Sequence, residues 1–289
     1  VTIGKDAVKG NSSSTTTGIN GTVGIGMDAL TAITTGVGNT AVGFEAGLGV
    51  VDNGYNTALG YKAFHNVGNT SGIYNVAIGY EALMGGTGTA TDNDANSSVA
   101  IGYRALQDVV DADHNIAIGY LASTNVTSGE SNIAIGSSAG AALTSQGANI
   151  AIGLSSLSVI NAGSGGNTTI GFQSMMSSGT ATNNNAEYNT ALGYQALKDI
   201  TTGYTNVAVG KGAGENITTG HSNIAIGTGA LDVSTDVDYA VIIGKNAGEA
   251  DMTSGADGTI AIGYKTLSLL TSGSANISIG YEALRYTTT

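Results

Sequence analysis

The sequence predicts an all-β fold, a parallel β-solenoid or β-roll of sixteen or so coils, each of about 17 residues. Three observations lead to this prediction. A short motif of the form Ala-Ile-Gly recurs along the 289 residues, and successive motif glycines are usually about 17 residues apart. Each motif has the alternating pattern of a short β-strand. The chain also contains no Pro, a residue that would remove a backbone donor from almost any position in a ladder of stacked strands.

The repeat keeps one base period, and longer spacings, such as that from Gly79 to Gly102, occur where loops are inserted. A longer period overlies it, because the step from Gly79 to Gly171 equals the step from Gly171 to Gly263. We therefore expect a single repeat array over residues 1–289 with a five-coil superrepeat of about 91 residues. The sixteen motif glycines are Gly4, Gly26, Gly43, Gly60, Gly79, Gly102, Gly119, Gly136, Gly153, Gly171, Gly193, Gly210, Gly227, Gly244, Gly263 and Gly280.

Each coil is expected to contain a strand directly before its motif glycine, which is counted as position 0. Position −1 is Ile, Val or Leu in all sixteen motifs, position −3 is Val, Ile or Thr, and position −2 is Ala in eleven. This period-2 pattern places the large aliphatic pair on one face and the Ala on the other. An Asn column at position −4 is expected to form a stacked ladder, in which the amides bond between coils.

Two further features are expected in each coil. A second extended segment is predicted after the motif glycine, as at residues 103–106, where the sequence reads Tyr-Arg-Ala-Leu. A turn follows in "TTG" or "TSG" triplets, where Gly is expected to supply a positive φ angle. The glycines of these triplets are Gly36, Gly129, Gly203, Gly220 and Gly273.

A coil this short cannot bury its own apolar face, but stacking identical coils solves this problem. Each strand then pairs in parallel with the same strand of the next coil. The interior of such a coil is thin, and we expect the Ile and Val columns to fill it. A column of Ala allows another backbone to approach closely, so we expect an Ala column to face a partner chain.

The motifs resemble the head repeats of trimeric autotransporter adhesins. The similar stretches are "NIAIGYLA" at residues 115–122, "NVAIGYEA" at 75–82 and "SSVAIGYRA" at 97–105. The resemblance covers the whole chain and implies a left-handed, homotrimeric, parallel β-roll. This chain departs from those heads, whose coils are typically shorter, by its longer coil with an added "TTG" turn. The stretch "NTALGYQAL" at residues 189–197 also resembles repeats in bacteriophage tail fibres.

An aromatic column at position +1 is a candidate ligand-facing surface. Tyr offers an apolar ring and a polar tip, a combination that suits sugar rings. The alternative is a purely structural ladder that closes the coil or an inter-chain seam. The residues of this column proposed to face a ligand are Tyr61, Tyr80, Tyr103 and Tyr120.

Acidic and amide residues give two more candidate sites. Asp111 with Asp113, and Asp236 with Asp238, occupy equivalent places before their motif glycines. Oxygen-rich loops of this kind can bind Ca²⁺. A solvated turn is the favoured explanation, and these residues are weak Ca²⁺ candidates. The inserted loops at residues 85–96 and 177–187 are the best display sites, because solenoid insertions often cluster on a binding face. Their candidate residues are Asp92, Asn93, Asn183 and Asn184.

Composition disfavours several functions. The net charge of −12 disfavours nucleic acid as a partner. The lack of Cys excludes thiol chemistry and disulfides. No apolar run reaches the length of a membrane span, so no insertion by this segment is expected. His65, His114 and His221 show no partners at metal or triad spacing. We therefore expect a protein that is not an enzyme and needs no cofactor.

The expected function is that of a structural or adhesive fibre segment that attaches to a host or surface. It would be extracellular, at a cell surface or on a virion, with a glycan or cell-surface receptor as its partner. The alternative is a self-assembling extracellular filament without a specific ligand. An ice-binding solenoid is a third possibility, but the regular Thr-x-Thr face that it needs is missing.

Overall fold

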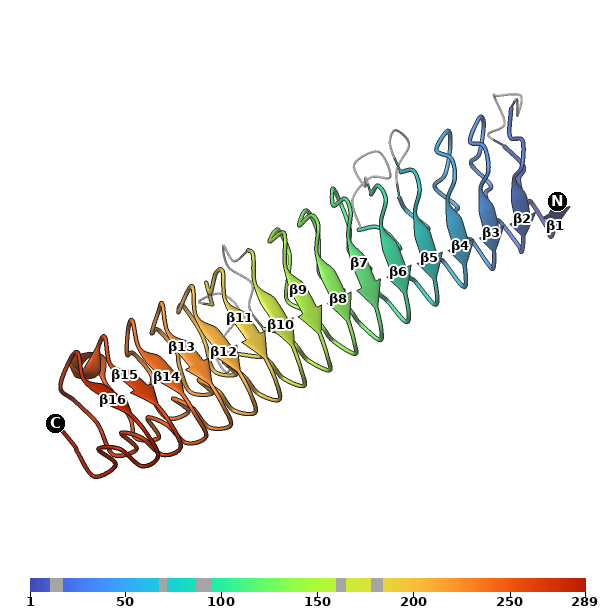
Figure 1. The fold of residues 1–289 in the computed structure, drawn as a ribbon. Helices are drawn as coiled ribbons and strands as arrows, with labels where there is room; N and C mark the ends of the chain where they lie inside the picture. Colours follow the sequence, from blue (N-terminus) through green and yellow to red (C-terminus); the bar gives the residue numbers. More distant parts are fainter. Residues whose placement is uncertain (11–17, 68–71, 87–94, 160–164, 178–183) are drawn as a thin grey trace. The chain divides into compact units, whose positions relative to one another are not determined.

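The computed structural model confirms an all-β parallel solenoid with sixteen strands (Figure 1). It describes residues 1–10, 18–67, 72–86, 95–159, 165–177 and 184–289. The chain forms two compact units, Val1–Gly147 and Ala148–Thr289. In the first unit the strands are β1 (Thr2–Ile3), β2 (Val23–Ile25), β3 (Thr40–Val42), β4 (Thr57–Leu59), β5 (Val76–Ile78), β6 (Val99–Ile101), β7 (Ile116–Ile118) and β8 (Ile133–Ile135).

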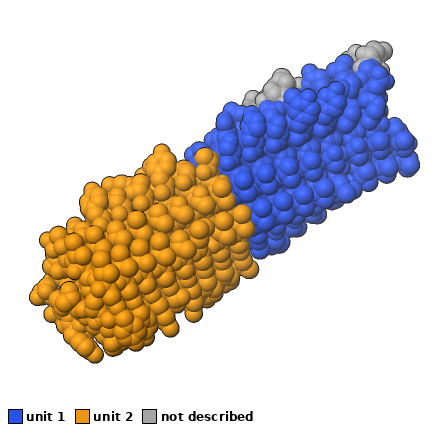
Figure 2. Space-filling view, viewed as in Figure 1, with its two compact units in different colours: residues 1–147 blue, residues 148–289 orange. Residues whose placement is uncertain are grey.

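The second unit has the same construction. Its strands are β9 (Ile150–Ile152), β10 (Thr168–Ile170), β11 (Thr190–Leu192), β12 (Val207–Val209), β13 (Ile224–Ile226), β14 (Val241–Ile243), β15 (Ile260–Ile262) and β16 (Ile277–Ile279). A short 3₁₀ helix, η2 (Ser254–Ala256), lies between β14 and β15. The surface of each unit consists of rows of atoms that repeat from coil to coil (Figure 2).

Within each unit, every strand pairs in parallel with the next strand along the chain, and equivalent positions lie side by side. In the first unit Ala100 is paired with Ala117, and Ala117 with Ala134. In the second unit Ala191 is paired with Ala208. The predicted stacking of like residues on like residues is therefore confirmed.

The predicted direction of the two strand faces was wrong. Ala117 is fully buried, whereas Ile116 and Ile118 on either side of it are half-buried. The same order, with a buried centre and more exposed flanks, holds for nearly all the three-residue strands. The Ala column therefore lines the interior, and the large aliphatic columns face outward. Part of each strand's aliphatic surface is thus left exposed on its unit.

The reason is the narrow space between position +3 of one coil and position −2 of the next coil. Where both positions carry a hydroxyl, the two side chains touch: Ser156 Oγ lies 2.6 Å from Thr169 Oγ1. The same contact recurs between Thr266 and Ser278, at 2.8 Å. The gap favours small side chains, since protein interiors are close-packed. The wider part of the core is filled by residues after the motif glycine, including Leu83, Leu106, Val109, Val126, Leu143, Leu197, Ile200 and Ile217.

The prediction of a second extended segment at residues 103–106 was also wrong. These residues form turns, in which Arg104 and Leu106 have positive φ angles of 53° and 50°. The Arg104 N–H donates to Tyr80 in the preceding coil, whereas the Leu106 N–H donates to Ala122 in the following coil. In a strand, residues two apart point their N–H groups to the same side, so this segment cannot be one.

The turn glycines are required for a different reason than predicted. Gly36, Gly129, Gly203 and Gly220 do not have positive φ angles; of the five triplet glycines only Gly273 does, at 100°. A Cβ added at Gly203 or Gly220 would instead clash with a carbonyl oxygen of the next coil. These positions are glycine because two backbones approach closely there.

The predicted Asn ladder is confirmed. Asn206 is buried, and its Nδ2 donates to the Gly220 carbonyl at 2.8 Å and to Asn189 Oδ1 at 3.1 Å. Its own Oδ1 accepts the backbone N–H and the Nδ2 of Asn223, both at 3.0 Å. Each amide thus satisfies buried groups in two neighbouring coils, which an apolar side chain cannot do.

Candidate functional site

The strongest candidate surface is a row of stacked rings in the first unit, here named the aromatic ladder: Phe44, Tyr61, Tyr80, Tyr103 and Tyr120. Each ring stands one residue after a motif glycine, just beyond the end of a strand. Successive ring centroids are 5.2, 5.0, 5.3 and 5.2 Å apart, and the rings are within 12° of parallel. Equivalent residues on neighbouring coils therefore build a continuous, regularly spaced stack.

The ladder remains open to solvent at its outer edge. Tyr61, Tyr80, Tyr103 and Tyr120 are 41, 41, 38 and 54% exposed, respectively. Inside the stack each ring face is covered by the next ring, so the accessible parts are ring edges and hydroxyl groups. A sugar ring has no room to lie face to face on an inner rung. The ladder instead offers a line of phenol hydroxyls, which both donate and accept hydrogen bonds.

A charged row runs beside the aromatic ladder at position +2, formed by Glu45, Lys62, Glu81 and Arg104. Arg104 Nε lies 2.8 Å from Glu81 Oε2, and Lys62 Nζ lies 3.3 Å from Glu45 Oε2. The two pairs balance in charge. Partly exposed pairs of this kind add little to stability, but they fix the side chains beside the rings.

Each cation of this row also lies against a ring of the ladder. The Lys62 ammonium is 5.6 Å from the Tyr61 centroid, and the Arg104 guanidinium is 5.1 Å from the Tyr103 centroid. The Glu81 carboxylate accepts a hydrogen bond from Tyr80 and thereby raises the pKa of that phenol. Tyr80 therefore stays a neutral hydroxyl at neutral pH.

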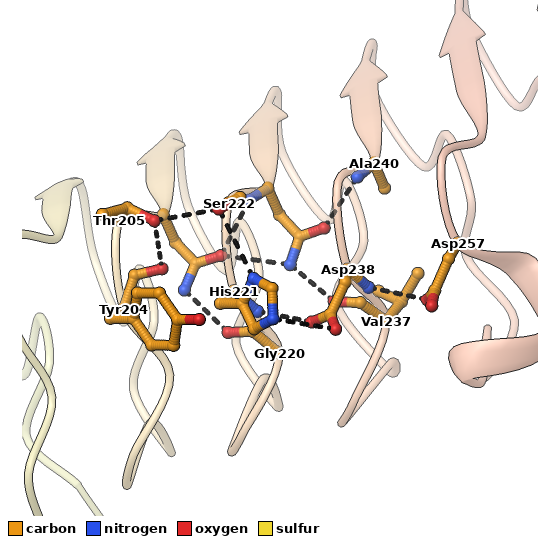
Figure 3. Close-up of polar contacts among 11 residues, drawn as sticks. Tyr204, Thr205, Gly220, His221, Ser222, Val237, Asp238, Ala240 and Asp257 are labelled. Carbon is orange, nitrogen blue, oxygen red and sulfur yellow. Dashed lines mark hydrogen bonds and ion pairs between the residues drawn. The ribbon is translucent and has the colours of Figure 1, made fainter.

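Two of the three histidines have polar partners that their spacing in the sequence does not reveal. His65 Nε2 lies 2.8 Å from Glu45 Oε2, and its Nδ1 lies 2.6 Å from Asn66 Oδ1. His221, in the second unit, lies between Tyr204, Ser222 and Asp238 (Figure 3). The partners Glu45, Tyr204 and Asp238 stand in neighbouring coils, at separations set by coil length, and no short motif in the sequence reveals them.

The His221 cluster brings a Ser, a His and an Asp together. His221 Nε2 is 3.0 Å from Asp238 Oδ2, and His221 Nδ1 is 3.4 Å from Ser222 Oγ. The ring also stacks on Tyr204, at 4.6 Å between centroids, and meets Tyr239 edge-on at 5.1 Å. Ser222 Oγ is 3.0 Å from Thr205 Oγ1 (Figure 3).

This cluster does not have the geometry of a nucleophilic site. Acyl transfer needs N–H groups that are free to bind an oxyanion beside the nucleophile. The backbone N–H groups of His221, Ser222 and Asn223 already donate to Asp238, Tyr204 and Asn206 in neighbouring coils. The arrangement is therefore best explained as a set of side-chain contacts that link successive coils.

Two of the four Ca²⁺ candidates, Asp113 and Asp238, also link neighbouring coils. Asp113 Oδ1 accepts from the backbone N–H and the Nδ2 of Asn96, at 2.7 and 3.1 Å. Asp238 pairs with His221, Asp111 is exposed, and Asp236 is half-buried. Among the residues that the structure describes, no three His, Asp or Glu side chains are grouped so as to hold a metal ion.

The loop candidates fall into two groups. Asp92, Asn93 and Asn183 lie outside the described residues. Asn184 is described and is fully buried, so its prediction as a ligand-facing residue is corrected. Asn184 stands two residues before Ala186, which is also fully buried.

The sequence did not reveal a further surface, here named the outward stripe. It consists of the first and last residues of the three-residue strands, two aliphatic or β-branched columns that stay partly exposed. Leu59, Ile170 and Ile226 on this stripe are 46, 41 and 36% exposed. The columns themselves were visible in the sequence, but they were assigned to the interior because large aliphatic residues are usually buried.

Comparison with known proteins gives no family for the chain: no protein-family model matches it, and neither does any curated protein. In the described ranges, no helix combines the length and hydropathy that a membrane span requires. The function must therefore be argued from the solenoid and its surfaces.

Proposed function

We propose that this chain is a structural and adhesive fibre segment, built as a parallel, left-handed homotrimer and displayed outside the cell or on a virion. The observation that carries the proposal is the outward stripe. Partly exposed aliphatic residues follow one another along the strands of both units. Contiguous apolar surface of this extent is typical of a protein–protein interface.

The periodicity of the stripe favours copies of the same chain as its partners. The stripe repeats once per coil, at the spacing of paired strands, about 4.8 Å. A partner must present apolar groups at that same repeat to fill the grooves between rungs. A second copy in parallel register meets this requirement at every coil, and closed rotational symmetry gives each copy the same contacts. Three stripes facing a common axis would bury both columns.

The adhesive part of the proposal concerns the surfaces left outside such an assembly. The aromatic ladder follows the stripe along the chain and stays open to solvent. The sequence also inserts extra residues into the repeat at 85–96 and 177–187. The resemblance to adhesin heads and tail-fibre repeats supports the same role. Because the rod would use most of its residues for its own ladder of bonds, recognition would depend on these few irregular or aromatic places.

Light scattering on the folded chain tests the assembly. The expected mass is three times the 28.5 kDa of one chain. Replacing Ile118→Lys and Ile135→Lys places charges on the stripe and should lower the mass to that of one chain, because a buried unpaired charge is costly. Ser128→Lys, on a turn of the same coil as Ile118, is the matched control and should leave the trimer intact.

Other results would contradict the proposal. A wild-type chain that is folded and monomeric at all concentrations overturns the assembly. A mass that keeps rising with concentration, together with filaments in electron micrographs, would favour the self-assembling filament instead.

A further inference from the structure

We propose that the aromatic ladder binds an extended, neutral, β-1,4-linked glycan that lies along the stack. This inference rests on the adhesive role proposed above and names the class of ligand. It starts from the regular spacing of the five rungs, 5.0 to 5.3 Å. The binding surface is the line of ring edges and hydroxyls at the exposed side of the ladder.

The spacing selects among linear polymers. An extended polypeptide advances about 3.3 Å per residue and repeats its outward side chains every ~6.6 Å, so it loses register with the rungs within two residues. A stacked nucleic acid strand advances about 3.4 Å per nucleotide and carries charge that an acidic chain repels. An extended β-1,4-linked glycan advances by nearly one rung per sugar. Successive sugars of such a chain are turned by half a turn, so it offers a sugar hydroxyl to each Tyr hydroxyl, alternately from the two edges of the chain, and equivalent hydroxyls meet every second rung.

The chemistry of the rungs suits hydroxyl ligands. Each Tyr hydroxyl donates one hydrogen bond and accepts others. The Glu81 carboxylate raises the pKa of Tyr80, so this hydroxyl stays protonated and able to donate and accept. The polarised hydrogens on a ring edge also face solvent, and they attract oxygen atoms.

The charged row argues for a neutral polymer. Glu45 pairs with Lys62, and Glu81 pairs with Arg104, so no net charge is left beside the rungs. A polymer of uronic acids or sulfated sugars would find no excess of cations there. The overall charge of −12 would repel it further.

The length of the ladder also predicts how affinity depends on the length of the glycan. Five consecutive rungs lie in the first unit, whereas the described aromatic pairs of the same column in the second unit are Phe172–Tyr194 and Tyr264–Tyr281. Four of these five rungs are Tyr, so affinity should rise with glycan length up to about four sugars and then level off, since each Tyr hydroxyl adds one contact.

The test is calorimetric titration of the folded, assembled protein with cello- and chito-oligosaccharides of two to six sugars. Maltohexaose, which is α-1,4-linked and helical, is the control for pitch. We expect binding of the β-1,4 series that strengthens with length, and at least about tenfold weaker binding of maltohexaose.

The hydroxyls are tested by the triple variant Tyr61→Phe, Tyr80→Phe and Tyr103→Phe. Phe44 already stacks in this column, so the variant should keep its fold and melting temperature. Its affinity should fall at least about tenfold, because the ligand's hydroxyls lose their partners. Tyr194→Phe and Tyr264→Phe, in the two-rung pairs, should leave binding unchanged.

Two results would overturn the proposal: no binding of any β-1,4-linked oligosaccharide, or undiminished binding by the triple variant. The fibre role is measured separately, by the light-scattering mass and by attachment of the protein to intact cells. Attachment without glycan binding would leave the fibre role standing and reject only this ligand class.

Discussion

At the scale of single residues, the Asn column shows how one side-chain type satisfies several buried backbone groups. Its ladder is predictable from the sequence, because a periodic amide before each strand has few other uses. The role of the turn glycines was harder to predict, because glycine is favoured both where φ is positive and where two backbones approach closely. Gly203 and Gly273 stand in the same kind of triplet, yet only Gly273 has a positive φ. The sequence does not distinguish these two causes.

Asn206→Ala should destabilise the fold by roughly 2–4 kcal/mol, because the buried backbone N–H of Asn223 and the Gly220 carbonyl both lose a partner. Urea unfolding measures the loss. Asn206→Ser should cost less, since Ser98 holds the same position and its Oγ accepts the Asn115 N–H at 3.1 Å. Equal losses for the two variants would contradict this assignment of the bonds.

At the scale of the strand, the sequence predicted the element and its two faces but not which face is buried. Period-2 alternation defines two faces, and the usual burial of large aliphatic residues favours the wrong one here. The width of the coil determines which face is buried. That width depends on how closely the segment after the motif glycine approaches the strand. The sequence does contain one sign of this packing. Positions +3 and −2 of successive coils depart from Ala together in two places, Ser156 with Thr169 and Thr266 with Ser278.

A paired substitution tests this packing. Ala191→Ile should destabilise the second unit by about 1–3 kcal/mol, because an extra branched side chain overfills the gap beside Leu197. Adding Leu197→Gly should restore part of the loss. The coil of β14 shows this compensation: it carries Ile242 with Gly248, and a Cβ at Gly248 would lie 3.3 Å from Ile242 Cγ2.

Thermal melting of the two variants and of Leu197→Gly alone completes a double-mutant cycle. The cycle should show a favourable coupling between the two sites. Strictly additive effects would mean that positions −2 and +4 do not share the same space.

At the scale of the whole molecule, the repeat explains why sequence alone gave the architecture but not the function. Each coil contacts its neighbours, so the period of the sequence is the period of the fold. The surfaces of the molecule are formed by columns of equivalent residues from successive coils. The shape of the coil's cross-section determines whether such a column is exposed. Tyr61, Tyr80, Tyr103 and Tyr120 form an accessible ladder, whereas Asn184 is buried, and the period of the sequence does not reveal this difference.

Removal of one whole coil should be tolerated. Deleting residues 120–136 joins Gly119 to Ser137 and preserves the period, so circular dichroism should still show a β-rich, cooperatively melting protein. Deleting residues 120–128 breaks the period and should abolish cooperative unfolding. Similar behaviour of the two deletions would contradict the repeat as the unit of folding.

The central claim is that the aliphatic columns face outward and join parallel copies of the chain. The chain contains no Cys, so single introduced thiols report on position directly. Under mild oxidation, Ile118→Cys should form disulfides between chains in high yield, because equivalent residues meet in a parallel, in-register assembly. Ala117→Cys should form none, since position 117 lies inside its own coil. Cross-linking at position 117, or none at position 118 in a folded protein, would contradict the account.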